Sequence, residues 1–139
     1  MLTCRKLLSA LLLPAWLVAC GGDGDPRLQG TWRSDKALTL AHLSPEAGLT
    51  TEQRHFLARN LGDVQLHFDG AKAAVSFASQ AGQPLRWEAY RWTATAPDTV
   101  GIETGNGGPV TYTFAGNCLH MQAAWGYREF FCRLPNAGV

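Results

Sequence analysis

From residue 63 onward, hydrophobic and polar residues alternate with a period of two, which is typical of strands that bury one face. The pattern predicts a strand over residues 64–68 and a returning strand over residues 72–78, and Asp69-Gly70 between them favours a tight hairpin turn. The side chains expected on the inward face of this pair are Val64, Leu66, Phe68, Ala73, Val75 and Phe77. A tight turn requires the two strands to be antiparallel.

Turn residues divide the rest of the chain into further short strands. They are expected over residues 28–33, 85–95, 99–104, 110–115, 118–122 and 127–134. Because tight turns make neighbouring strands antiparallel, about eight strands would form an up-and-down meander. A meander of this size can close into a small barrel, which removes the exposed edges of an open sheet. The sequence therefore predicts a mainly β fold in a single domain.

One or two helices are expected between the first and second strands. Ser34-Asp35 can cap a helix over residues 36–43. Thr50 with Gln53 three positions later resembles a capping box that starts a second helix, and Gly62 lies where a glycine would end it. The residues on one face of this second helix are Gln53, Phe56, Leu57, Asn60 and Leu61.

The first twenty residues have the pattern of an export leader. Arg5 and Lys6 form a short positive region, and residues 7–18 form an apolar stretch of about twelve residues, too short to span a bilayer and typical of a signal peptide. The stretch ends in Leu17-Val18-Ala19-Cys20, which resembles the lipobox of bacterial lipoproteins. This resemblance implies that residues 1–19 are removed and that lipid is attached to Cys20. An ordinary signal peptide followed by a chance cysteine is the alternative.

The same resemblance implies where the mature protein is held. Acyl chains on Cys20 give stable membrane attachment, at about 0.8 kcal/mol per buried CH₂. Gly21 stands where an aspartate would retain an enteric lipoprotein in the inner membrane, so the periplasm-facing side of the outer membrane is favoured. Residues 20–27 are expected to be a lipidated, flexible tether, residues 28–135 a barrel-like domain and residues 136–139 a tail.

Two further cysteines, Cys118 and Cys132, follow Cys20 into an oxidising compartment, where two thiols usually pair. A hairpin centred on Trp125 sets position 118 opposite 132, 120 opposite 130 and 122 opposite 128. Directly opposed residues of a non-hydrogen-bonded pair have Cα atoms about 4.5 Å apart, within reach of a disulfide. The closed loop of about fifteen residues would contribute about 3 kcal/mol. A metal site on Cys118-x-His120 is the alternative, but two residues are too few ligands.

Gly30-Thr31-Trp32 on the first predicted strand resembles the Gly-x-Trp signature of the lipocalin and calycin superfamily. In that superfamily an arginine on the last strand lies over the tryptophan and helps to close one end of the barrel. The resemblance therefore implies a cation–π contact between Trp32 and either Arg133 or Arg128. Helices inserted after the first strand are similar to the fatty-acid-binding branch. A lipocalin-like cavity for a small apolar ligand is also implied, although small barrels can be filled by their own side chains.

Charge and motifs argue against several classes of function. Without Arg5 and Lys6 of the leader, ten basic and eleven acidic residues remain, which is no footprint for a nucleic acid. A nucleophilic enzyme needs an element such as Gly-x-Ser-x-Gly, and none is present, so the protein is not expected to be an enzyme. The histidines at 42, 55, 67 and 120 show no ligand spacing, so no metal or other cofactor is expected.

Three glutamates lie on predicted strands: Glu88, Glu103 and Glu129. A pair of them could line a cleft as two acids. Exposed strand carboxylates that lie opposite arginines are the commoner arrangement, and this is what we expect for them.

The aromatic residues are numerous, and most of them must be core. The strand over residues 85–95 carries Arg86, Tyr90 and Trp92 on one face and Trp87 on the other, and its alternation does not decide which face is inside. If Arg86, Tyr90 and Trp92 face outward, they form a contact patch, because aromatics and arginine dominate the energetics of interfaces.

A non-enzymatic binding protein of the cell envelope is the resulting expectation. Interaction with a protein partner, or its inhibition, is slightly preferred. A carrier of a small apolar ligand is the first alternative, and a structural envelope protein without a discrete ligand is the second. A cavity in the barrel would favour the carrier, whereas a filled barrel with an exposed aromatic patch would favour the protein partner.

Overall fold

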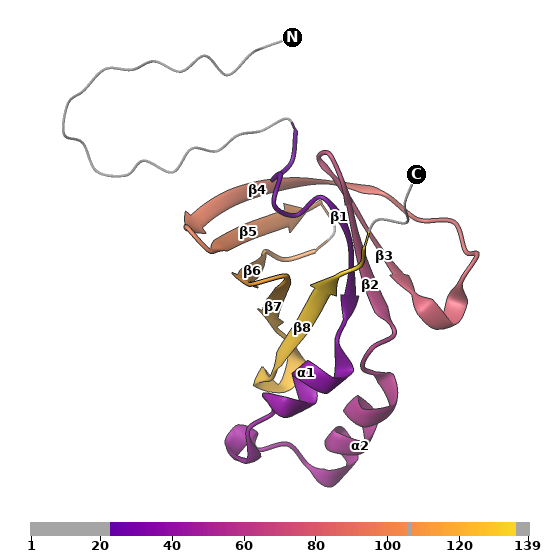
Figure 1. Ribbon diagram of the computed structural model, residues 1–139, viewed down its shortest axis with the longest axis vertical. Coiled ribbons are helices and arrows are strands. Elements are labelled where there is room, and N and C mark those ends of the chain that lie inside the picture. Colours follow the sequence, from indigo (N-terminus) through magenta and orange to yellow (C-terminus); the bar gives the residue numbers. More distant parts are fainter. Residues whose placement is uncertain (1–22, 106, 136–139) are drawn as a thin grey trace, which may run out of the picture.

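The computed structural model describes residues 23–105 and 107–135. Within them, eight antiparallel strands follow one another around a closed barrel, each paired with its neighbours along the chain and the last paired with the first (Figure 1). The strands are β1 (Gly30–Ser34), β2 (Val64–Asp69), β3 (Lys72–Phe77), β4 (Glu88–Ala96), β5 (Thr99–Thr104), β6 (Val110–Ala115), β7 (Cys118–Gln122) and β8 (Arg128–Arg133). The predicted up-and-down barrel is confirmed.

Two α-helices, α1 (Lys36–Ala41) and α2 (Thr51–Asn60), lie between β1 and β2, beyond one end of the strands (Figure 1). Asp35 starts α1 by accepting a hydrogen bond from the backbone N–H of Leu38 at 2.8 Å. This helix ends at Ala41 rather than at residue 43. Neither helix of the described residues is long and apolar enough to cross a membrane.

The predicted capping box starts α2. Thr50 Oγ1 accepts from the backbone N–H of Gln53 at 3.2 Å, and Gln53 Oε1 accepts from the backbone N–H of Thr50 at 2.9 Å. The buried stripe of the helix is narrower than predicted, because Leu57 and Leu61 are buried while Phe56 is 47% exposed. Helix α2 thus covers the barrel with one side only and leaves an aromatic ring at the surface.

The hairpin of β7 and β8 has the predicted register. The opposed pairs include Cys118 and Cys132, His120 and Phe130, and Gln122 and Arg128. Cys118 and Cys132 form a disulfide with their Cα atoms 4.0 Å apart. Closing a loop of about fifteen residues contributes about 3 kcal/mol through the entropy of the unfolded chain. Because Cys118 is bonded to Cys132, it is not available for the alternative metal site with His120.

One end of the barrel is closed by a stack of Trp32 and Arg133. The guanidinium carbon of Arg133 lies 4.2 Å from the centroid of the indole, which is 2% exposed. Arg133 also donates to the backbone oxygens of Gln29 and, at 2.7 Å, of Arg27. The indole N–H of Trp32 donates to the oxygen of Leu28 at 2.7 Å. Of the two candidate arginines, Arg133 makes this contact.

The described residues just before β1 belong to the fold, which corrects the expected flexible tether over its part from Gly24 to Arg27. The expected leader over residues 1–19, the lipidated Cys20 and the tail over residues 136–139 lie outside the described residues. Asp25 is 1% exposed, and its carboxylate binds Arg27 Nη2 at 2.7 Å. Arg27 donates in turn to the backbone oxygen of Pro97 at 2.7 Å. Gly24 has a φ of +72°, and a Cβ there would lie 1.8 Å from the oxygen of Gly70, so only glycine fits. The folded domain therefore already includes residues 24–27.

The barrel wall is incomplete between β3 and β4. β4 begins at Glu88 rather than at residue 85, and its register with β3 ends at the pair Ala73 and Glu88. If that register continued, Pro84 would lie opposite Phe77, where proline has no N–H to donate to the ladder. The chain between the two strands instead swings away from the barrel, at the right of Figure 1.

We expect Trp32→Ala to lower the free energy of unfolding by about 3 to 5 kcal/mol, because the substitution removes a buried ring and its contact with Arg133. Trp87→Ala is the matched control, since that indole is 42% exposed and its loss should cost far less. Denaturant unfolding followed by circular dichroism measures both values. Equal losses for the two variants would contradict the role of Trp32 in closing the barrel.

Candidate functional site

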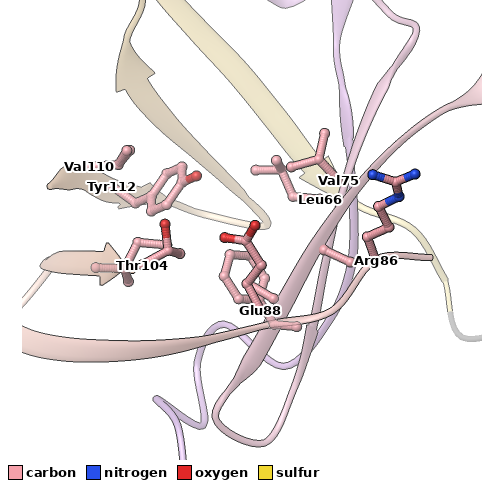
Figure 2. Close-up of a pocket in the computed structure, with 11 residues that line it drawn as sticks. Leu66, Val75, Arg86, Glu88, Thr104, Val110 and Tyr112 are labelled. Carbon is pink, nitrogen blue, oxygen red and sulfur yellow. The ribbon is translucent and has the colours of Figure 1, made fainter. Parts of the chain in front are cut away.

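A cavity of about 360 Å³ lies between the wall of β2 and β3 and the wall of β5 and β6 (Figure 2). Its lining consists of Leu66, Phe68, Ala73, Ala74, Val75, Arg86, Glu88, Ile102, Thr104, Val110 and Tyr112. Most of these side chains are hydrophobic, and few carry a polar group. Sites for small molecules have this composition and volumes from about 300 Å³ upward. The barrel is therefore not completely filled by its own side chains.

The cavity opens through the gap between β3 and β4. Val75 lies opposite Leu66 and Phe77 opposite Val64, so both point inward as the alternation predicts. Val75 is nevertheless 57% exposed and Phe77 44% exposed. Their predicted burial is wrong because the stretch of β4 that would cover them is missing. Hydrophobic side chains at this edge thus face a space that a guest molecule can enter.

Three polar groups project into the space between the two walls: the hydroxyls of Thr104 and Tyr112 and the carboxylate of Glu88 (Figure 2). Burial, and secondarily the charge of Glu129, raises the pKa of Tyr112 to about 12. Tyr112 is therefore a neutral phenol at physiological pH and can donate a hydrogen bond to a guest. Arg86 adds an exposed positive charge to the lining.

A second acid, Glu129, faces the interior from β8. Ser34 Oγ donates to Glu129 Oε1 at 2.7 Å, and the hydroxyl of Tyr127 also bonds to this carboxylate. Burial raises the pKa of Glu129, and the two hydrogen bonds oppose that shift. Burial and the charge of Glu129 raise the pKa of Tyr127 to about 12. Glu129 does not line the cavity. Tyr112 does, and the charge of Glu129 contributes to the raised pKa of Tyr112.

The three strand glutamates therefore have different surroundings. Glu103 is exposed, and its Oε2 lies 3.7 Å from Nη2 of Arg91 on β4, as expected for a surface carboxylate. Glu88 is also exposed, although it lines the cavity. Glu129 is partly buried instead, and the expectation of an exposed carboxylate is wrong for it. Sequence alternation could have placed Glu129 inside, because it shares the parity of Phe131 and Arg133. A glutamate gives no apolar signal, however, so the position was assigned to the surface.

The contact patch expected from Arg86, Tyr90 and Trp92 does not form an outward surface. Tyr90 is 5% exposed, and its hydroxyl donates to the backbone oxygen of Gly70 at 2.9 Å. Trp92 is half-buried against the core, and its indole N–H is buried without a hydrogen-bond partner among the described residues. Arg86 lines the cavity. The outward indole of this segment is Trp87, which the alternation placed on the opposite face.

A second apolar surface was not predicted. Phe56 on α2 and Trp125 in the β7–β8 turn are both nearly half exposed and meet edge to face, with ring centroids 5.7 Å apart. Trp125 has a φ of +64°, a strained value for a residue other than glycine. Sequence reasoning placed Trp125 in the turn but could not pair it with a helix that is distant along the chain.

In the part of the chain that the structure describes, no three His, Cys, Asp or Glu side chains gather as a metal site would require. Comparison of the chain with family models, with curated proteins and with solved structures gives no significant match. The chemistry of the cavity is therefore the basis on which a function can be proposed.

We expect Glu129→Gln to raise the melting temperature at about pH 7 and to leave it almost unchanged at about pH 3.5. Because the pKa of Glu129 is raised in the folded protein, the unfolded chain loses this proton at lower pH. The free energy of unfolding therefore falls as pH rises from the ordinary pKa of 4.5 to the raised pKa of the folded protein. The Glu129→Gln variant has no proton to lose at this position, so it escapes that fall. Glutamine keeps an oxygen that can accept from Ser34.

Glu103→Gln is the control for this experiment, since Glu103 is an exposed acid. We expect it to give no comparable pH-dependent gain. Differential scanning calorimetry at the two pH values measures the effect. A gain for Glu129→Gln that is equally large at low pH would show that the buried charge is not its cause.

Proposed function

We propose that this chain is a lipid-anchored protein of the bacterial cell envelope whose barrel binds a small, mainly apolar molecule in the cavity between β2–β3 and β5–β6. The observation that carries the proposal is the inward-facing yet open edge of β3, where Val75 is 57% exposed beside a cavity of about 360 Å³. Protein interiors are normally packed to the density of organic crystals, so an apolar space of this size needs an explanation. A bound guest supplies one.

The polar groups of the lining narrow the chemistry of the guest. Thr104 can donate or accept, Tyr112 is a neutral donor and Glu88 is an acceptor when ionised. An aliphatic or aromatic body would pack on Leu66, Ile102 and their neighbours, while one hydrogen-bonding group would reach these polar atoms. Such a molecule is an amphiphile with a small head rather than a pure hydrocarbon.

Binding is favoured over catalysis because the two acids Glu88 and Glu129 do not share one site. Glu88 lines the cavity, whereas Glu129 is engaged by Ser34 and Tyr127 and lies outside the lining. General acid and base catalysis would require both groups to reach the same guest. The slightly preferred expectation of a protein partner loses its proposed surface, because Tyr90 is buried.

An anchor at Cys20 is compatible with a cavity that opens away from the membrane. Gly24 is buried against Gly70 near the end that Trp32 and Arg133 close, whereas the cavity opens along the gap beside β3. The four Cα–Cα steps from Cys20 to Gly24 span at most about 14 Å. An anchored barrel would thus hold its closed end near the bilayer, with Gly21 favouring the outer membrane, and would leave the gap accessible from the periplasm.

We expect Cys20→Ser to move the protein from the membrane fraction to the soluble periplasmic fraction, because lipid on this cysteine is the proposed attachment. Immunoblots of separated fractions measure the distribution. Cys118→Ser is the control: it removes a cysteine of the disulfide and should leave the protein with the membrane. Continued membrane fractionation of the Cys20→Ser protein would overturn the anchor.

We expect the Cys20→Ser protein, handled without detergent, to bind the apolar fluorophore N-phenyl-1-naphthylamine, and Ala73→Phe to weaken that binding about tenfold or more. The half-buried Ala73 lines the cavity, so phenylalanine there would fill it. Lys72→Phe is the matched control, since it adds the same ring to the outer face of the same strand. Fluorescence titration measures the affinities, and melting temperatures verify that both variants fold.

Native mass spectrometry of the same protein, purified gently from periplasm, tests for the natural guest. A small molecule that is released on denaturation, and is absent from Ala73→Phe, supports the proposal and gives the mass of the guest. Equal fluorophore binding by Ala73→Phe and Lys72→Phe would place the apolar site elsewhere and overturn it.

A further inference from the structure

The edge of β3 that faces the gap is a free strand edge. β3 pairs with β2 along its whole length, from Lys72 to Phe77. On its other side, the register with β4 ends at Ala73 and Glu88. In the part of the chain that the structure describes, no β4 residue lies opposite Val75 or Phe77. An exposed edge of this kind is a template for pairing with another extended chain.

The direction of the backbone groups at this edge follows from the bonds around it. Successive residues of an antiparallel strand direct their N–H and C=O groups to alternate sides. Ala78 donates to the oxygen of Asp63 at 2.8 Å, which directs even-numbered residues toward β2. Tyr90 donates to the oxygen of Ala71 at 2.9 Å, which directs odd-numbered residues toward β4. Val75 and Phe77 therefore direct their N–H and C=O groups into the gap.

The chain itself is poorly suited to complete this edge. Pro84 would lie opposite Phe77 in the continued register, at a position that must donate an N–H, and proline has none. Trp87, the last residue before β4, lies against His67 on β2 with ring centroids 6.4 Å apart, which holds this end of the connecting segment on the outer face of the sheet. The gap is thus a feature of the sequence and not only of one loop conformation.

We propose that an extended segment of another protein adds to β3 at Val75–Phe77 as an extra strand and places an apolar side chain in the cavity. The backbone groups specify the occupant, because a row of donors and acceptors repeated every second residue matches a polypeptide and not a small amphiphile. The cavity between Val75 and Val110 then receives the inward side chain (Figure 2). This inference does not rest on small-molecule binding, although the two guests would compete for one space.

The geometry also favours a single segment over a second copy of this chain. A stable dimer buries about 1,200 to 2,000 Å² in total, and an edge of three residues supplies only a small part of that area. A lone strand gains in addition the burial of its inward side chain. On the outer face of β3 the added strand would lie beside Ser76, whose hydroxyl is hydrogen-bonded to His67 at 2.7 Å. Because one face of the added strand meets the apolar cavity and the other meets this polar surface, the segment should alternate apolar and polar residues. An acidic residue would complement the exposed Arg86.

The test begins with selection of random twelve-residue peptides displayed on phage against the immobilised Cys20→Ser protein. We expect enriched peptides that alternate apolar and polar residues. In the free protein, nuclear magnetic resonance should show fast amide exchange at Val75 and Phe77 and slow exchange at Ala74 and Ser76. Saturation with the synthetic form of an enriched peptide should protect Val75 and Phe77.

Val75→Pro removes the donor at the free edge without touching the bonds to β2, and Val75→Thr is the control of similar shape that keeps it. We expect proline to weaken peptide binding about tenfold or more, and threonine to have little effect. If Val75→Pro fails to fold, peptides that carry N-methyl groups on alternate residues test the same bonds on the unchanged edge, and methylation in one of the two registers should abolish binding.

The outcomes separate the two proposals. Absence of enriched peptides, or enriched peptides that leave Val75 and Phe77 unprotected, would overturn strand addition even if the fluorophore binds. Peptide binding in a protein that binds no fluorophore would support strand addition and count against a small-molecule guest. Displacement of bound fluorophore by the peptide would show that both occupy the cavity.

Discussion

The barrel depends on the contact that joins its first and last strands. β1 and β8 share only three paired positions, the outermost being Trp32 with Arg133. At that position the guanidinium covers a buried indole and also holds two backbone oxygens of the segment before β1. The disulfide then fixes β8 to β7. The contacts that close the barrel are therefore concentrated at one end, where Arg133 both covers the ring of Trp32 and donates to the backbone.

A closed end of this kind lets the opposite side remain incomplete. The core around Trp32, Leu28 and Leu119 is fully buried, so the stability of the barrel does not require complete pairing of β3 with β4. The wall can then stop at Ala73 and Glu88 and leave a cavity beside the free edge. The small molecule and the added strand that we propose both depend on this arrangement, because each needs a rigid barrel in which β3 and β4 are only partly paired.

The sequence was sufficient where a signal is local. The period of two predicted the strands, Thr50 with Gln53 predicted the start of α2, and the spacing of Cys118 and Cys132 predicted their pairing. A cavity was implied by the resemblance alone, but its place and its opening could not be predicted, because they result from strands that are distant along the chain and from the place where one register stops. Alternation placed Val75 inward but said nothing of what would cover it. Glu129 was missed for a different reason: its parity with Phe131 places it inward, but a glutamate gives no apolar signal.

An open edge beside an apolar cavity is a hazard for aggregation, and its persistence in this barrel calls for a physical reason. The edge is limited to a few residues, and the splayed segment that carries Pro84 cannot close it by itself without losing a backbone bond. Filling the cavity with larger side chains, or replacing Pro84 so that the ladder could continue, would be simple ways to remove the hazard. A sequence that keeps both the space and the proline is consistent with an edge that is covered by a guest.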